Sequence, residues 1–291
     1  MDIAFHIGAH GTDDDLLLNC LRHNAGYLAR QGVIVPAGEV YRPVMRDAIR
    51  KLQGAEAEPD EEESLLELVL KGMTGQRLVM SSENFICIPQ RVFDDGIFYN
   101  KMGHKSVWLR NVFPGQRVSF FLAIRNPAAF IPELYLRRKQ GAFEEFLDQI
   151  DLNTVQWSRV IATLADAVPD CSITVWCAED APLIWPEVMC ALAGLEDAKN
   201  LERTDVHLRS IMLPEGMTRL KDYLEKHPGL AVPQRRWATI SFLDKYAKDS
   251  AMEDSYDLPG WTQERIEVFT QAYEADMDVI AELPGVTMIQ P

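Results

Sequence analysis

Short apolar runs alternate with longer segments of helical periodicity along the first two thirds of the chain. Four runs have the composition of buried strands covered on both faces, at residues 3–8, 77–80, 118–124 and 173–177. Three- and four-residue spacing of apolar positions predicts helices after residue 127 and at 13–31, 40–52, 64–73, 155–167 and 185–193. This alternation predicts a three-layer α/β/α fold around a mainly parallel sheet.

The alternation stops near residue 195. The remainder has charged segments, scattered prolines and a final helical pattern at about 262–281. Neither a flexible linker nor an internal repeat separates it from the rest. We therefore predict a single domain over 1–291, with a core at about 1–195 and a helical C-terminal portion at about 196–291. The acidic stretch at 54–63 is expected to be a solvated loop.

Acidic side chains outnumber basic ones by 44 to 29, so the 291-residue chain carries a formal net charge of −15. This excess disfavours nonspecific nucleic-acid binding, which depends on Lys and Arg beside phosphates. No apolar run approaches the ~20 residues of a membrane-spanning helix. Five scattered cysteines and an N-terminus that begins as a strand fit a protein with reduced thiols. We expect a cytoplasmic protein that binds neither nucleic acid nor membrane.

Three loops follow predicted strands, at residues 8–15, 81–84 and 125–133. In an open parallel sheet, such loops meet at the carboxyl edge, where ligands bind. The first contains Gly8 and Gly11 and opens a helix, so its N–H groups suit an anion. Glu83 is a candidate general base or a capping loop carboxylate. His10 is a candidate acid or base, whereas His6, inside a strand, fits a core position.

The order of several motifs resembles the bacterial members of the sulfotransferase superfamily, and this resemblance covers nearly the whole chain. The motifs are HIGAHGT at 6–12, GVIVP at 32–36, SSE at 81–83, IRNP at 124–127, FIPELY at 130–135 and YEAD at 273–276. The resemblance implies a P-loop NTPase-like fold that binds 3′-phosphoadenosine 5′-phosphosulfate. It also implies transfer of the sulfuryl group to a hydroxyl of a small molecule or carbohydrate, without a metal.

The family pattern assigns roles to particular positions. Its first loop binds the phosphosulfate through backbone amides, a Lys and hydroxyl residues. An Arg after the third strand and a Ser eight residues later bind the 3′-phosphate. By resemblance, Arg125 and position 133 would bind the 3′-phosphate, and Glu83 or His10 would be the base. The rest of the donor site would consist of Gly8, Ala9, His10, Gly11 and Thr12.

The sequence departs from this pattern inside the donor site. Gly11 stands where the family has Lys, Asp13–Asp15 replace Gly-Thr-Thr, and Glu133 replaces Ser. A carboxylate ~4 Å from a phosphate costs about 4 kcal/mol at an effective dielectric constant of 20. Loss of a transition-state donor costs on the order of 3 kcal/mol. The three acids also suit a helix N-terminus, and they cannot all face one metal ion.

Two further hypotheses follow from these departures. One is a catalytically inactive homologue that uses the cleft or its acidic surface to bind a ligand or partner. The other is an enzyme for a less anionic or cationic substrate. A working donor site needs positive charge that outweighs Asp13 and Glu133. The candidate basic residues are Arg125, Arg137, Arg138, Lys139, Arg235 and Arg236.

Overall fold

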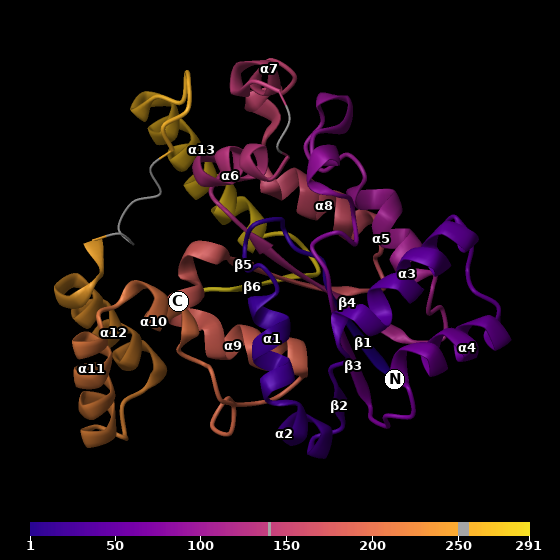
Figure 1. Ribbon diagram of the computed structural model, residues 1–291, viewed down its shortest axis with the longest axis horizontal. Coiled ribbons are helices and arrows are strands. Elements are labelled where there is room, and N and C mark those ends of the chain that lie inside the picture. The colour runs from indigo at the N-terminus through magenta and orange to yellow at the C-terminus, as the bar shows by residue number, and fades with distance from the viewer. Residues whose placement is uncertain (139–140, 250–255) are drawn as a thin grey trace.

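A six-stranded sheet forms the centre of the computed structural model, which describes residues 1–138, 141–249 and 256–291 (Figure 1). The strands lie in the order β2-β3-β1-β4-β5-β6, and every neighbouring pair is parallel. Their bounds are β1 Asp2–His6, β2 Val33–Ile34, β3 Arg77–Ser81, β4 Arg117–Ile124, β5 Ser172–Cys177 and β6 Val286–Ile289.

Helices cover both faces of this sheet. Those before β4 are α1 Leu16–His23, α2 Ala25–Arg30, α3 Gly38–Leu52, α4 Pro59–Leu70 and α5 Met102–Arg110. The next four are α6 Pro127–Arg138, α7 Phe143–Leu147, α8 Trp157–Ala167 and α9 Ala181–Ala193. The last are α10 Val206–Ile211, α11 Pro214–Lys226, α12 Val232–Tyr246 and α13 Gln263–Ala281. None of the helices in the described ranges is long and apolar enough to cross a membrane.

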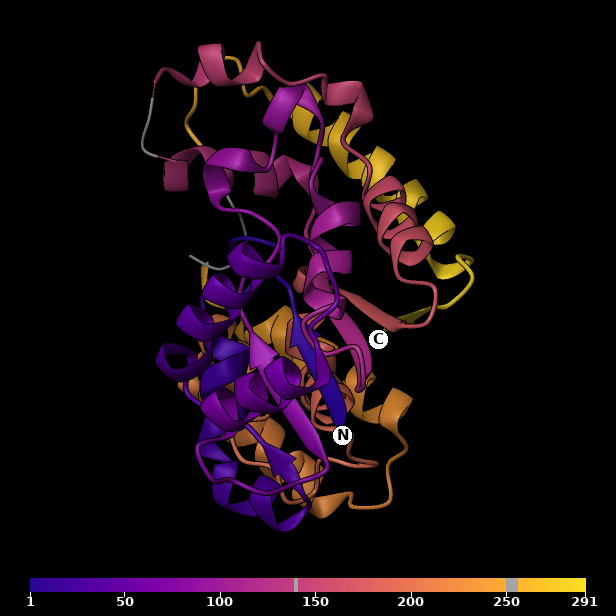
Figure 2. The ribbon, with the colours of Figure 1, turned by 90° about the vertical axis from the view of Figure 1, so that its right-hand side faces the viewer.

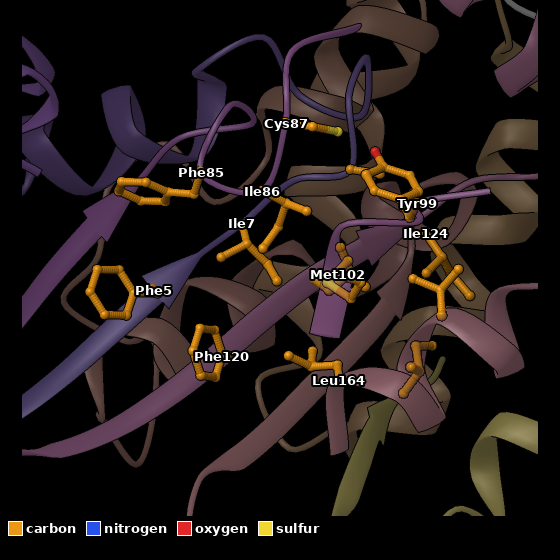
Figure 3. Packing of buried hydrophobic residues seen from close by; sticks show 14 of the residues in the cluster. Phe5, Ile7, Phe85, Ile86, Cys87, Tyr99, Met102, Phe120, Ile124 and Leu164 are labelled. Atoms are coloured by element: carbon orange, nitrogen blue, oxygen red, sulfur yellow. The ribbon is translucent and has the colours of Figure 1, made fainter. Parts of the chain in front are cut away.

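Side chains that alternate along the strands feed two hydrophobic cores, one on each face of the sheet. In β1, Phe5 belongs to the larger core and Ala4 to the smaller one. The larger core joins the sheet to α3, α5, α6, α8 and α13, and Figure 3 shows Phe5, Phe120 and Leu164 within it. The smaller core lies beneath α1, α2 and α9 (Figure 1). The predicted three-layer α/β/α arrangement is therefore confirmed.

Two predicted segments differ from the structure for local reasons. The helix expected at 13–31 is interrupted at Asn24, whose buried side-chain amide donates to the carbonyls of Cys20 (2.8 Å) and Glu202 (3.0 Å). The acidic stretch at 54–63 is only partly a loop, because α4 begins at Pro59, a residue suited to a first helical turn. Glu62 is buried and accepts a hydrogen bond from the Gly115 N–H.

The chain beyond residue 195 supplies a strand as well as helices. β6 pairs with β5 at the edge of the sheet, and its Val286 and Met288 pack against the larger core. The yellow helix α13 lies beside the pink helix α8 (Figure 2). Helices α10, α11 and α12 pack in sequence beside α9. The final segment therefore takes part in the central sheet, a role that its charged sequence does not signal.

The chain leaves the central strands towards opposite faces of the sheet. After β1 it enters α1 over the smaller core, whereas after β3 and β4 it enters α5 and α6 over the larger core. Such a reversal opens a crevice above the carboxyl ends of the strands. The three candidate loops begin at this crevice.

Candidate functional site

The three loops meet at Gly11, in the loop that follows β1. The Gly11 N–H donates to Glu83 Oε1 at 3.2 Å, and Arg125 Nη1 donates to the Gly11 carbonyl at 3.0 Å. Gly11 has a φ of +68°, a backbone conformation that glycine adopts with little strain. The sequence-based expectation that 8–15, 81–84 and 125–133 come together is therefore confirmed.

Three of the backbone amides expected to cradle a donor anion, those of Ala9, His10 and Gly11, are bonded within the protein. The Ala9 N–H donates to the Ala123 carbonyl at 2.8 Å, and the His10 N–H donates to the Tyr99 hydroxyl at 3.3 Å. The Gly11 N–H is held by Glu83, and the Thr12 hydroxyl donates back to the Ala9 carbonyl at 2.8 Å. An incoming phosphate would have to break these bonds before it could use the amides of Ala9 and Gly11.

Asp13 occupies the N-terminus of α1. Its Oδ2 accepts a hydrogen bond from the Leu17 N–H at 2.9 Å, and its carbonyl accepts one from the Leu16 N–H at 2.8 Å. Burial raises the pKa of Asp13 to about 6, with further contributions from the neighbouring Asp15 and Asp14. The helix terminus that would attract a ligand anion is therefore already capped by a carboxyl group of the chain.

Arg137 lies beside the position where the family pattern has its Lys. A Cβ atom built on Gly11 would stand 3.0 Å from Arg137 Nε. The guanidinium of Arg137 pairs with Asp14 at 2.7 Å and with Glu133 at 2.8 Å, and it lies 4.0 Å from Glu83 Oε2. Positive charge thus lies near Gly11, but carboxylates of the protein surround it.

Arg42, on α3, pairs with an acid of the same loop, as Arg137 does. It donates to Asp15 Oδ2 at 2.9 Å, contacts Asp15 Oδ1 through a second nitrogen, and donates to the Ser81 carbonyl at 2.9 Å. Asp14 and Asp15 both have positive φ angles, of 47° and 65°, and they pair with arginines from two different helices. They belong to a turn before α1, which replaces the expected first helical turn.

Acidic groups outnumber basic ones around this loop. The three guanidiniums are those of Arg42, Arg125 and Arg137, and the five carboxyls are those of Asp13, Asp14, Asp15, Glu83 and Glu133.

Other basic candidates are engaged elsewhere. Arg138 lies 4.6 Å from the Phe146 ring centroid, Arg235 donates to the carbonyls of Leu230 and Pro228, and Arg236 pairs with Glu187 at 2.8 Å. Lys139 lies outside the described residues. The positive excess that a phosphosulfate site needs is not met by the described side chains around Gly11.

Glu83 has the titration behaviour of an acid–base group. Burial raises its pKa to about 7, and Asp13 adds to this shift, while Arg137 and the Gly11 N–H oppose it. Its side chain borders a pocket of about 240 Å³ with Asp14, Asp15, Arg42, Ser82 and Asn84. A carboxyl group whose pKa is near 7 can both accept and release a proton at neutral pH.

The two histidines of the first motif belong to the interior. His10 is 2% exposed; its Nδ1 lies 2.8 Å from the Tyr99 hydroxyl and its Nε2 lies 3.0 Å from the Cys87 carbonyl. A carbonyl only accepts, so Nε2 carries the proton and Nδ1 accepts from Tyr99. Burial lowers the pKa of His10 to about 4. With both ring nitrogens bonded, His10 cannot serve as the expected base, and His6 is a core residue bonded to Ser81.

Six basic residues that the sequence analysis did not single out line a groove next to the Glu83 pocket. This basic groove has a volume of about 580 Å³ and shares Arg42, Ser82 and Asn84 with the pocket. Its basic side chains are Arg42, Arg46, Arg50, Arg91, Lys101 and Lys105. A signal was present in the sequence, because Arg42, Arg46 and Arg50 recur every four residues and so share one helix face.

Within residues 1–138, 141–249 and 256–291, no group of three or more His, Cys, Asp or Glu side chains is arranged to hold a metal ion. No protein-family model matches the chain, and no curated protein is significantly similar to it.

Proposed function

We propose that this protein is a non-catalytic relative of the sulfotransferases that binds a ligand in the cleft above β1, β3 and β4. The observation that carries this proposal is the internal closure of the loop at 8–15. The amides of Ala9, His10 and Gly11 bond to the protein, and Asp13 caps α1. Asp14 and Asp15 hold Arg137 and Arg42, respectively. Binding and catalysis are separable properties of a fold, so loss of the donor site leaves the cleft intact as a binding surface.

Charge makes this closure costly to reverse. A phosphosulfate nucleotide brings several negative charges to a loop already surrounded by five carboxyl groups, three of them its own, and by three guanidiniums. Each carboxylate left ~4 Å from a phosphate costs about 4 kcal/mol at an effective dielectric constant of 20. Freeing Arg137 for the donor would leave Asp14 and Glu133 without their partner.

The part of the cleft beside β3 and α3 is lined by polar groups. Ser82, Asn84 and Arg42 line both the Glu83 pocket and the adjoining basic groove. These groups offer a hydroxyl, an amide and a guanidinium, which together recognise hydroxyl and anionic groups. The cleft therefore suits a polar ligand that enters from the side of β3 and α3.

Sulfuryl transfer is the second candidate function, and two observations favour it. The pKa of Glu83 is raised to about 7, and Arg137 stands beside Gly11. In this candidate, Arg137 would exchange Asp14 for the donor and replace the family's Lys. Glu83 would take the proton of the acceptor hydroxyl as the acceptor oxygen bonds to sulfur. The bond between sulfur and the 5′-phosphate oxygen would break, releasing 3′-phosphoadenosine 5′-phosphate.

Calorimetric titration with 3′-phosphoadenosine 5′-phosphate separates the two candidates. We expect no binding to the unaltered protein at millimolar nucleotide. The double variant Asp14→Asn/Asp15→Asn should gain binding, because it releases Arg137 and Arg42 while Asn tolerates the left-handed backbone at both positions. Micromolar binding by the unaltered protein that Arg125→Ala abolishes would instead establish the donor site and support sulfuryl transfer. Thermal unfolding of each variant checks that it is folded.

A further inference from the structure

The basic groove concentrates positive charge in a protein whose formal net charge is −15. Three of its residues, Arg42, Arg46 and Arg50, lie one turn apart on α3. Two more, Lys101 and Lys105, lie one turn apart at the start of α5, which contacts α3. Arg91 comes from the short 3₁₀ turn Pro89–Arg91 between them in sequence. Two helices therefore present cationic rows to one shared groove.

Like charges in this arrangement repel one another. Side chains of equal sign at four-residue spacing destabilise a helix, and the acid between Arg46 and Arg50, Asp47, pairs with Arg46. The pKa of Lys105 is lowered, first by burial and then by Lys101 and Arg91, so the groove cations act on one another. An anionic ligand would remove this repulsion.

Part of this charge is not neutralised by the protein. Arg42 pairs with Asp15, Lys101 contacts Asp94, and Arg46 lies 3.3 Å from Asp47. Among the described residues, no carboxylate pairs with Arg50, Arg91 or Lys105, and Lys105 Nζ instead lies 3.5 Å from the centroid of the Trp108 ring. Among the side chains of residues 1–138, 141–249 and 256–291, none that is acidic lines the groove itself.

We propose that the basic groove binds an acidic oligosaccharide, a chain of sugars that carries sulfate or carboxylate groups. This inference rests on the proposed function, because it names the ligand class of the same cleft. The cations would pair with the acidic substituents. Ser82 and Asn84, at the boundary with the Glu83 pocket, would bond to sugar hydroxyls. A volume of about 580 Å³ lies within the usual range of ligand sites.

The lining disfavours two other classes of polyanion. Single-stranded nucleic acids need exposed aromatic faces on which bases stack, and the aromatic residue of this lining, Phe85, is only 8% exposed. Acidic peptides that bind in extended form add to a free strand edge. Here β3 pairs with β1 along its whole length and with β2 at Arg77 and Leu78. At its end beside the groove, the backbone of Ser81 is bonded by the Tyr41 hydroxyl and the Arg42 guanidinium.

Binding to sulfated dextran oligosaccharides and to oligogalacturonate, measured by calorimetry at low and high salt, tests the proposal. We expect the protein to bind at least one of these probes, with salt-sensitive affinity, and not to bind neutral dextran. The triple variant Arg46→Gln/Arg50→Gln/Arg91→Gln should weaken binding by about 10- to 100-fold. A matched control, Arg22→Gln/Arg30→Gln/Arg219→Gln, removes three exposed charges away from the groove and should retain full affinity.

Several results would overturn the inference. One is that neither acidic saccharide binds. Another is that the control variant loses as much affinity as the groove variant. A third is that polyphosphate or polyglutamate binds at least as tightly as the saccharides. The same proteins titrated with 3′-phosphoadenosine 5′-phosphate keep the two proposals apart, because the groove variant leaves Arg42, Arg125 and Arg137 unchanged. Nucleotide binding by the unaltered protein contradicts the proposed function, whereas the saccharide result decides the groove.

Discussion

Gly11 is the residue at which the three loops of the cleft touch one another. It bonds to Glu83 and Arg125 through its backbone, and Arg137 and Glu133 pack against the space where a side chain would be. Its lack of a side chain thus accommodates the Arg137 clamp.

Gly11→Ala should destabilise the fold more than Gly72→Ala. Both positions have positive φ, +68° and +81°, so each substitution carries a backbone penalty of roughly 1–2 kcal/mol. At Gly11 the added methyl would also stand 3.0 Å from Arg137 Nε and Glu133 Cγ, whereas nothing lies within 4 Å at Gly72. Urea denaturation of both variants measures the difference. Equal losses of unfolding free energy would mean that the side chains of Arg137 and Glu133 move aside without destabilising the fold.

At the scale of elements, Asn24 separates α1 from α2 and fastens both to the segment after α9. Its amide donates to the Cys20 and Glu202 carbonyls, and its Oδ1 accepts from the Glu202 N–H at 2.8 Å. The side chain is 4% exposed, so these bonds form out of contact with water. One polar residue therefore ends a helix whose apolar periodicity would continue.

Asn24→Ala should lower the free energy of unfolding by about 1–3 kcal/mol, because it leaves buried backbone groups of Glu202 without partners. Asn19→Ala is a suitable control, since Asn19 lies exposed on the same helix. Denaturant unfolding of the two variants is the measurement. A loss at Asn24 no larger than at Asn19 would show that water replaces these bonds.

Over the whole molecule, buried titratable groups act on stability from opposite ends of the pH scale. Burial lowers the pKa of His6 and His10 from 6.5 to about 4, so their contribution is present above pH 6.5 and is lost as pH falls towards 4. Burial raises the pKa of Glu83 from 4.5 to about 7, so its contribution is present below pH 4.5 and is lost as pH rises through 7.

These opposed shifts predict a stability maximum between about pH 5 and 7. His6→Asn should reduce the fall of the free energy of unfolding between pH 6.5 and 4. It removes a side chain that binds a proton more readily in the unfolded chain than in the folded one. Glu83→Gln should gain stability relative to the unaltered protein between pH 4.5 and 7. Chemical unfolding across this range gives both profiles. Parallel profiles for all three proteins would contradict the assignment of these pKa shifts.

Much of the architecture followed from local pattern. Apolar runs placed β1, β3, β4 and β5, and helical periodicity placed α3, α6, α8, α9 and α13 within a few residues of their bounds. β2, α5 and β6 did not follow, because a two-residue strand, a helix without strong periodicity and a half-exposed edge strand lack distinctive patterns. The sequence predicted that the three loops meet at one edge of the sheet, and the place of β1 between β3 and β4 puts them around Gly11.

The features of the site also fall into two groups, those that the sequence determines and those that depend on tertiary packing. The sequence by itself determined that acids occupy the loop at 13–15 and that Glu83 and Arg125 follow strands, since strand ends and residue types are local properties. Only the tertiary structure decided that His10 is buried, that Arg137 and Arg42 neutralise Asp14 and Asp15, and that two helices form the basic groove. Burial and ion pairing depend on which distant segments pack together, and local sequence does not encode those distances.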